Sequence, residues 1–153
     1  MACATVLGSF LRSDVGVRRP LRGADLEMLS LKPEDAITDL VKIVGGVDAE
    51  VVFVTCIDVN GDVGESECFA SNTQPKNAIP IDQLYYLPEQ IGASAVMLTS
   101  TSSGPIKKLH DCDVEFTRRV IEAGRKRGIA VWDHVLVAGD QFRSMSQCTD
   151  LWK

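Results

Sequence analysis

The sequence has 153 residues, the size of one ordinary domain, and can bury a core without disulfides or structural metal ions. Its net charge of −5 argues against general affinity for nucleic acid. No stretch approaches the roughly 18 consecutive apolar residues that a membrane span requires. A secretory signal has positive charges ahead of its apolar stretch, and this sequence has none there. We therefore expect a cytoplasmic protein that does not enter a membrane.

The five cysteines are odd in number and widely spaced, and no two of them form a C-x-x-C pair. This pattern favours neither a zinc ribbon nor a thioredoxin-type site. Cys56 lies in an apolar run, where a free cysteine behaves as a small hydrophobic residue. We therefore expect reduced thiols, which are typical of proteins in reducing compartments.

The chain divides by its patterning into an arm and a domain. Residues 1–30 are basic and weakly patterned, and we expect an N-terminal arm there, ahead of a domain that spans residues 31–153. Proline and two acids at 33–35 favour the first turn of a helix, and the glycines at 45–46 favour its end. The domain therefore opens with a helix.

Strand and helix patterns then alternate. Residues 51–59 are rich in β-branched side chains and end at Asn60-Gly61, a dipeptide typical of hairpin turns, so residues 63–70 are expected to return as a second strand. The further expected elements are a helix at 82–91 that Pro88 bends or shortens, a strand at 93–98, a helix at 113–127, a strand at 129–137 and a short strand at 142–145. This order predicts an α/β (α+β) fold with a mixed central sheet flanked by helices.

Several short stretches form an ordered set along the chain. They are Glu50 ahead of an apolar strand, Ile57-Asp58-Val59-Asn60 at the hairpin, Ala95-Val96-Met97-Leu98, Asp113 with Thr117-Arg118-Arg119, and Trp132-Asp133-His134-Val135-Leu136-Val137. No single stretch is specific, but the set resembles the RadC branch of the JAB/MPN (JAMM) domain superfamily over roughly residues 32–146. The resemblance implies a JAB/MPN-like, cytidine-deaminase-like fold.

Active members of that family are zinc peptidases. A glutamate is their general base, and two histidines of a His-x-His-Pro loop hold zinc together with a downstream aspartate. Three protein ligands leave zinc an open position for a water molecule, whose pKa then falls to about 7. Carried over to this sequence, the resemblance places Glu50 at the base and Asp113 at the third ligand.

The two histidines of that motif are missing from this sequence. The resemblance places Ser100 and Ser102 at their positions, or Thr99 and Thr101 if the loop is aligned on residues 103–104. Either register supplies neutral hydroxyl groups, which are poor zinc ligands beside imidazole. We therefore expect no catalytic residue and no metal site at the family positions, and no cofactor.

A rebuilt zinc site around His110 is an alternative. His110, Cys112 and Asp113 offer three kinds of ligand in four residues, but three residues so close in sequence seldom converge on one tetrahedron. We favour a solvated loop in which Asp111 or Asp113 caps the following helix. Cys112 as a nucleophile beside His110 is disfavoured, because side chains two residues apart diverge. His134 is expected to pack at its strand without a catalytic role.

Basic residues gather around the helix expected at 113–127. They are Lys107, Lys108, Arg118, Arg119, Arg125, Lys126 and Arg127. Together with the arginines of the arm, between Arg12 and Arg22, they raise the alternative of a DNA-associated accessory protein. We favour a solvated helix face, because acidic residues interrupt the set and the whole chain is acidic.

The sequence therefore predicts a catalytically inactive RadC-like domain that acts as a protein-binding or scaffolding module, with a protein partner or a second copy of itself. The first alternative is a zinc-dependent peptidase or isopeptidase with a site remodelled around His110, and the second is the DNA-associated protein. In the silent domain, Glu50 and Asp113 would repel each other without a cation, so at least one needs a hydrogen-bond donor or a raised pKa. The hydroxyl groups of residues 99–103 are candidates for that donor.

Overall fold

The structure is a computed structural model and describes residues 44–45, 50–71 and 74–153. The expected arm at residues 1–30 and nearly all of the first expected helix lie outside the described residues. The division between arm and domain therefore stays a prediction.

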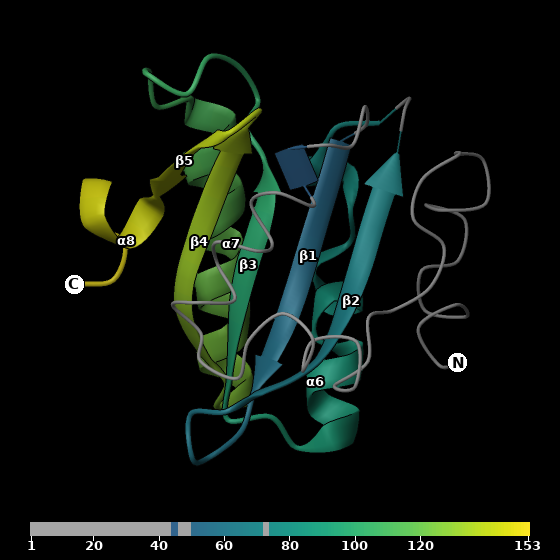
Figure 1. The fold of residues 1–153 in the computed structure, drawn as a ribbon. Helices are drawn as coiled ribbons and strands as arrows, with labels where there is room; N and C mark the ends of the chain where they lie inside the picture. The colour runs from purple at the N-terminus through teal and green to yellow at the C-terminus, as the bar shows by residue number, and fades with distance from the viewer. Residues whose placement is uncertain (1–43, 46–49, 72–73) are drawn as a thin grey trace.

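Five strands form one sheet in the order β2-β1-β3-β4-β5 (Figure 1). The elements in chain order are β1 (Glu50–Ile57), β2 (Val63–Ser71), the 3₁₀ turn η1 (Lys76–Ala78), α5 (Ile81–Leu84), α6 (Tyr86–Ile91), β3 (Ala95–Thr101), α7 (Asp111–Arg127), β4 (Ala130–Ala138), β5 (Gln141–Ser144) and α8 (Met145–Cys148). Strand β1 is antiparallel to β2 and β3, β3 is parallel to β4, and β4 is antiparallel to β5.

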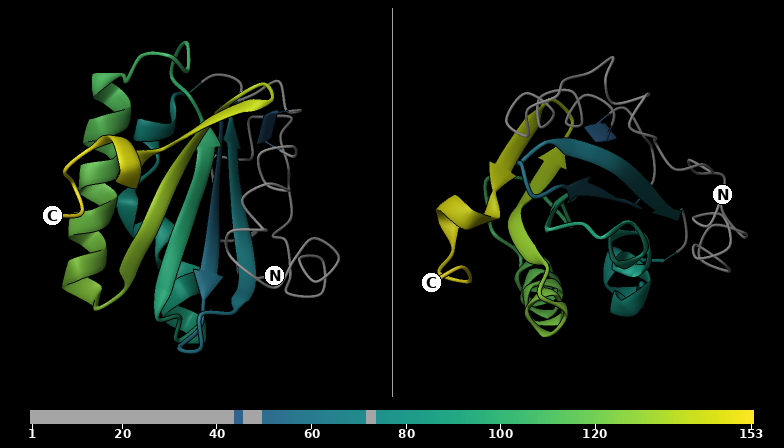
Figure 2. Two further views of the ribbon diagram at one scale, coloured as in Figure 1. Left: turned by 60° about the vertical axis from the view of Figure 1, so that its left-hand side comes forward. Right: turned by 90° about the horizontal axis from the view of Figure 1, so that it is seen from below.

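Helices α6 and α7 lie side by side on the same face of this sheet (Figure 2). Helix α7 connects the parallel strands β3 and β4, as a crossover helix must because a parallel pair cannot be joined by a tight turn. The mixed sheet with its helices confirms the α/β fold expected from the sequence and is consistent with a JAB/MPN-like domain.

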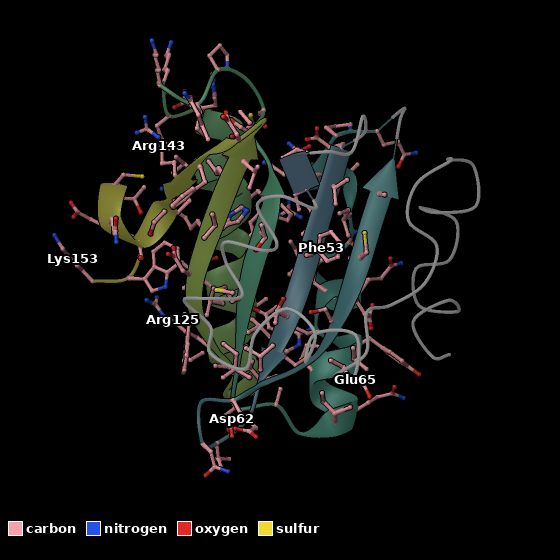
Figure 3. The ribbon with its side chains drawn as sticks, in the orientation of Figure 1. Phe53, Asp62, Glu65, Arg125, Arg143 and Lys153 are labelled. Carbon is pink, nitrogen blue, oxygen red and sulfur yellow. The ribbon has the colours of Figure 1, made fainter. Side chains whose placement is uncertain are left out.

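The core follows from the apolar run of β1. Seven of its eight residues are buried, as expected for a strand between two neighbours with both faces covered. Phe53 lies near the middle of this strand and is 1% exposed (Figure 3). Strand β3 is buried along most of its length in the same way. These two strands hold the polar residues of the candidate site in place.

Helix α7 has the amphipathic pattern that the sequence predicts. It buries Phe116, Val120 and Ile121 against the sheet and ends at Gly128, which adopts a left-handed conformation with φ 69°. It begins two residues earlier than expected, with His110 as the N-cap and no side-chain cap hydrogen bond. The expectation that Asp111 or Asp113 caps the helix is therefore wrong; Asp113 is turned into the protein instead.

Two segments differ from the expected elements. The helix expected at 82–91 is divided into α5 and α6 at Tyr85, and Pro88 is buried in the first turn of α6, where its missing N–H breaks no intrahelical bond. The last strand is followed by the short helix α8, which the sequence does not predict. Within the described ranges no helix is long and apolar enough to cross a membrane.

Candidate functional site

One end of the sheet gathers residues from four separate segments. The start of β1 meets the end of β3 because these strands are antiparallel, with Val52 opposite Ser100. Strand β2 returns to the same end, since Glu50 pairs with Ser71, and η1 follows it. Helix α7 starts there too, after the loop at the carboxyl end of β3 (Figure 1). The topology therefore brings Glu50, Ser100 and Asp113 together, as the resemblance implies.

Lys76 occupies the centre of this end, although sequence analysis did not single it out. Its side chain is 2% exposed, and its Nζ lies 2.5 Å from Oδ1 of Asp113. The same ammonium donates to the backbone oxygen of Thr101 and, at 3.4 Å, to Oγ of Ser100. A buried ammonium needs a carboxylate and further acceptors to offset its lost hydration. This site supplies one carboxylate and two further oxygen acceptors.

Asp113 is fully buried and also bonded on its other side. Ser103 donates its backbone N–H to Oδ2 at 3.1 Å and its hydroxyl to Oδ1 at 2.6 Å. Burial alone would raise the pKa of the Asp113 carboxyl, but the charge of Lys76 and the hydrogen bonds from Lys76 and Ser103 outweigh it and hold the pKa below its ordinary value. The carboxylate is therefore ionised and bonded at both oxygens, and a loop hydroxyl is one of its donors, as expected.

His134 is fully buried between two hydroxyl groups. Its Nε2 lies 2.6 Å from Oγ of Ser100, and its Nδ1 lies 2.7 Å from Oγ1 of Thr117. Thr117 already donates its one hydroxyl proton to the backbone oxygen of Asp113 at 2.7 Å. Nδ1 of His134 must therefore donate a hydrogen bond to Thr117, and Nε2 accepts a hydrogen bond from the hydroxyl of Ser100.

The pKa of His134 is that of a neutral imidazole. Burial, and then the charge of Lys76, lower the pKa of His134 from 6.5 to about 3, while Asp113 acts in the opposite direction. The ring also packs edge-on against Phe116, with ring centroids 5.8 Å apart. Sequence analysis expected His134 to pack at its strand; the structure adds a hydrogen bond at each ring nitrogen.

Glu50 and Ser102 make separate contacts in the same region. A carboxylate oxygen of Glu50 accepts the backbone N–H of Lys76 at 3.4 Å. Ser102 donates to the backbone oxygen of Gly104 at 2.7 Å. Thr101 is the residue that the alternative alignment of the loop places at a histidine position. Its Oγ1 accepts a hydrogen bond from the N–H of Val51 at 3.1 Å. The three side chains thus have separate hydrogen-bond partners within the chain.

The cluster proposed around His110 is not assembled. Nε2 of His110 lies 3.1 Å from the backbone oxygen of Pro105, and the ring covers Gly104, where an added Cβ would lie 2.6 Å from it. Cys112 is exposed, whereas Asp113 points into the protein toward Lys76. No three His, Cys, Asp or Glu side chains within the described ranges converge on a metal position. His110 instead fixes the conformation of the loop after β3.

The zinc that the resemblance implies does not fit the residues present. A zinc site uses imidazole, thiolate or carboxylate ligands, and here Asp113 is the one such group among the positions that the resemblance assigns to ligands. Ser100 is engaged with His134. The ammonium of Lys76, 2.5 Å from Asp113, supplies a positive charge where the zinc charge would stand. A second cation beside it would be repelled.

The basic residues on and beside α7 are partly engaged within the chain. Arg127 bonds Asp82 and Glu89 at 2.5 and 2.6 Å and stacks on the ring of Tyr85. Arg118 bonds Glu115, and Arg119 lies 3.5 Å from the backbone oxygen of Asn77. Strand β5 is held beside the loop after β3 by Arg143, whose Nε donates to the backbone oxygen of Ile106 at 2.9 Å (Figure 3).

Comparison with known proteins identifies the family of this chain. The chain is 24% identical over 134 residues to a UPF0758 protein of Roseiflexus sp. (strain RS-1), and 23% identical over 133 residues to a UPF0758 protein of Finegoldia magna. These alignments cover 88% and 86% of this chain, but the chain spans only 58% and 59% of the length of those two relatives. The family model of the RadC-like JAB domain matches residues 31–150, and the chain therefore belongs to the RadC-like JAB domain family.

Proposed function

We propose that this RadC-like domain is catalytically silent and acts by binding a protein, either a different chain or a second copy of itself. The observation that carries the proposal is the buried ion pair between Lys76 and Asp113. Asp113 stands where the family resemblance requires a zinc ligand, and its carboxylate is already neutralised by an ammonium of the same chain. A zinc ion would have to displace that ammonium before it could reach Asp113.

The hydroxyl groups at the histidine positions support the same proposal. Ser100 donates to His134 and accepts from Lys76, and Ser102 donates to Gly104, so both hydroxyl groups are engaged within the chain. Glu50 as a general base would need a metal-bound water whose pKa the metal lowers. Without the metal, water keeps its ordinary pKa and a carboxylate is too weak a base to activate it.

Exposed aromatic side chains support a binding role. Trp132 on β4 and Phe142 on β5 are 45% and 57% exposed. Aromatic residues are enriched at protein interfaces, where one face of the ring is desolvated by the partner. Strand β5 is also the last strand in the sheet order, and an edge strand offers backbone groups for a partner. These features favour a protein partner.

A nucleic-acid partner is less well supported. The overall charge of the chain is −5, and Arg118 and Arg127, which would contact phosphate in that reading, form ion pairs with acidic side chains of the chain itself. Retention on DNA at low salt that disappears at high salt would favour the nucleic-acid reading.

The test combines an assay of activity with a measurement of assembly. The purified protein is incubated with zinc and with peptide and isopeptide substrates, and its sedimentation velocity is measured alone and in native lysate. We expect no zinc-dependent hydrolysis and a species larger than the monomer. Zinc-dependent hydrolysis that is lost in His110→Ala would contradict the silent domain and support the remodelled peptidase. Sedimentation as a monomer under every condition would contradict the binding role.

A further inference from the structure

The ammonium of Lys76 is surrounded by oxygen atoms of three chemical kinds. Its three N–H groups have three acceptors, which are a carboxylate oxygen of Asp113, the hydroxyl oxygen of Ser100 and the backbone oxygen of Thr101. The number of acceptors equals the number of protons on a primary ammonium. The side chain is 2% exposed, so these contacts take the place of hydration.

Two of the three acceptors, those of Asp113 and Ser100, are held by hydrogen bonds that do not involve Lys76. Two donors from Ser103 hold the Asp113 carboxylate. The hydroxyl proton of Ser100 is directed to Nε2 of His134, so its oxygen can only accept from the direction of Lys76. The other nitrogen of His134 is held by Thr117. The surroundings therefore present acceptors alone, in a geometry that neighbouring residues maintain without the lysine.

We propose that these three oxygens form a binding site for a primary alkylammonium ion, which the tethered ammonium of Lys76 fills in the native chain. Removal of the lysine side chain opens the site to a free ion of the same chemistry. Three oxygens without imidazole or thiolate lack the ligands that zinc prefers, whereas they match the three N–H groups of a primary ammonium one to one. The inference rests on the proposed function, because zinc held by the native chain would have to replace Lys76.

The first experiment uses Lys76→Ala, which removes three methylene groups and the ammonium, the equivalent of a propylammonium ion. Melting temperature is measured with propylammonium chloride and, at equal concentration, with tetramethylammonium chloride, which has no N–H to donate. We expect propylammonium alone to raise the melting temperature of this variant, by about 3 °C at roughly ten times its dissociation constant. An equal response to both salts, or no response to either, would overturn the proposal.

Lys76→Met is the matched control. Methionine fills most of the space of the lysine stem without a charge, so propylammonium should not stabilise this variant. A shift in Lys76→Met equal to that in Lys76→Ala would overturn the proposal, because it would place the ion elsewhere. Uptake of zinc by Lys76→Ala in preference to propylammonium would also overturn the proposal that the site selects an alkylammonium ion. That result would not contradict the proposed function, because the native chain retains Lys76. Zinc bound by the native chain would instead contradict the proposed function.

A measurement on the native chain does not depend on whether the variants fold. Nitrogen-15 labelling of lysine allows the side-chain ammonium groups to be observed by NMR at neutral pH. We expect the ammonium protons of Lys76 to exchange with water much more slowly than those of the exposed lysines Lys107, Lys108 and Lys153, because Nζ of Lys76 is buried and bonded by all three protons. Uniformly fast exchange of every lysine ammonium would overturn the site.

Discussion

Oγ of Ser100 lies 2.6 Å from Nε2 of His134 on the neighbouring strand, so the serine proton is directed to the imidazole. In a hydrolase, such a pair would be a nucleophile and its base. Here both side chains are fully buried, and the serine oxygen accepts a hydrogen bond from the ammonium of Lys76. The pair therefore supports the lysine at the end of the sheet and offers no nucleophile to a substrate.

Acid should destabilise the fold through His134. Burial, then the charge of Lys76, lower its pKa from 6.5 to about 3, so below about pH 6.5 the unfolded chain takes up a proton that the folded chain refuses. Stability that is complete above that pH is lost as the pH falls toward 3. We expect the free energy of unfolding, measured in urea, to fall by on the order of 1 kcal/mol per pH unit between pH 6 and 4.

His134→Gln serves as the control for this prediction because glutamine has no proton to gain in the same range. Its free energy of unfolding should change less with pH between 6 and 4 than that of the native chain. Asp113, whose pKa is lowered, adds a loss of the same sign below its ordinary pKa of 3.8. A native chain whose stability is constant from pH 6 to 4 would contradict the buried neutral imidazole.

The two charges of the buried ion pair should be coupled, so that the losses on removing them singly sum to more than the loss on removing both. Asp113→Asn leaves the ammonium of Lys76 without its counter-charge, and we expect a loss of about 3–5 kcal/mol in the free energy of unfolding. Combined with Lys76→Met, the same substitution should cost less than the sum of the two single changes. Denaturant titration of the four proteins measures this coupling. Additive losses would contradict a direct contact.

An exposed ion pair is the matched control for that cycle. Lys153 and Asp150 lie 2.7 Å apart, but both side chains are largely in solvent. Removing Lys153 should change the free energy of unfolding by about 0.5 kcal/mol or less, because water screens the pair. A large effect there would indicate that the cycle reports something other than burial.

Asp133 should be required to hold the end of the chain on the sheet. Its carboxylate accepts from Ser144 Oγ, from the backbone N–H of Ser146 at 3.0 Å and from the backbone N–H of His134 at 2.7 Å. Asp133→Ala removes all three bonds, and we expect a loss of about 1–3 kcal/mol with faster amide exchange in residues 141–148. Unchanged exchange in that segment would contradict this role.

Gly124 should tolerate no side chain, because α7 lies close to its neighbours there. An added Cβ would lie 2.5 Å from the backbone oxygen of Ile129 and 2.7 Å from the hydroxyl of Tyr85. That hydroxyl donates to the backbone oxygen of Val120, so the ring cannot move away without losing the bond. We expect Gly124→Ala to lower the free energy of unfolding by about 1–3 kcal/mol.

Glu122→Ala, at an exposed position of the same helix, is the control for Gly124→Ala. It should change the free energy of unfolding by about 0.5 kcal/mol or less. Thermal or urea unfolding measures both variants. A stabilised Gly124→Ala would contradict the close approach, since relief of glycine entropy would then outweigh the contact.

Local patterning accounts for the elements that the sequence predicts well. The β-branched run at 51–57, the hairpin at Asn60-Gly61 and the amphipathic helix that ends at Gly128 are each specified by neighbouring residues. Helix α8 is not specified by its neighbours in sequence, because its first turn is held by Asp133, which lies more than ten residues earlier in the chain. The capping role expected for Asp113 fails for a related reason, since Lys76 draws its carboxylate inward.

The sequence predicts the polar residues of the site but not the buried lysine at its centre. The resemblance identified Glu50, Ser100 and Asp113, and the topology brings them to one end of the sheet. A single lysine in a polar stretch, at the first residue of η1, has the pattern of a solvated residue, and no local signal marks Lys76 as buried. A buried carboxylate without zinc requires a counter-charge, however, and that requirement could have directed a search for a nearby basic residue.

Metal content tests the central claim most directly. The native chain is expressed without an affinity tag in medium with added zinc, purified without chelator, and analysed by inductively coupled plasma mass spectrometry. The account predicts less than about a tenth of an equivalent of zinc, because Lys76 already neutralises Asp113 and the hydroxyls are weak ligands. Close to one equivalent of zinc per chain would contradict it and would make this domain a metal-binding member of its family.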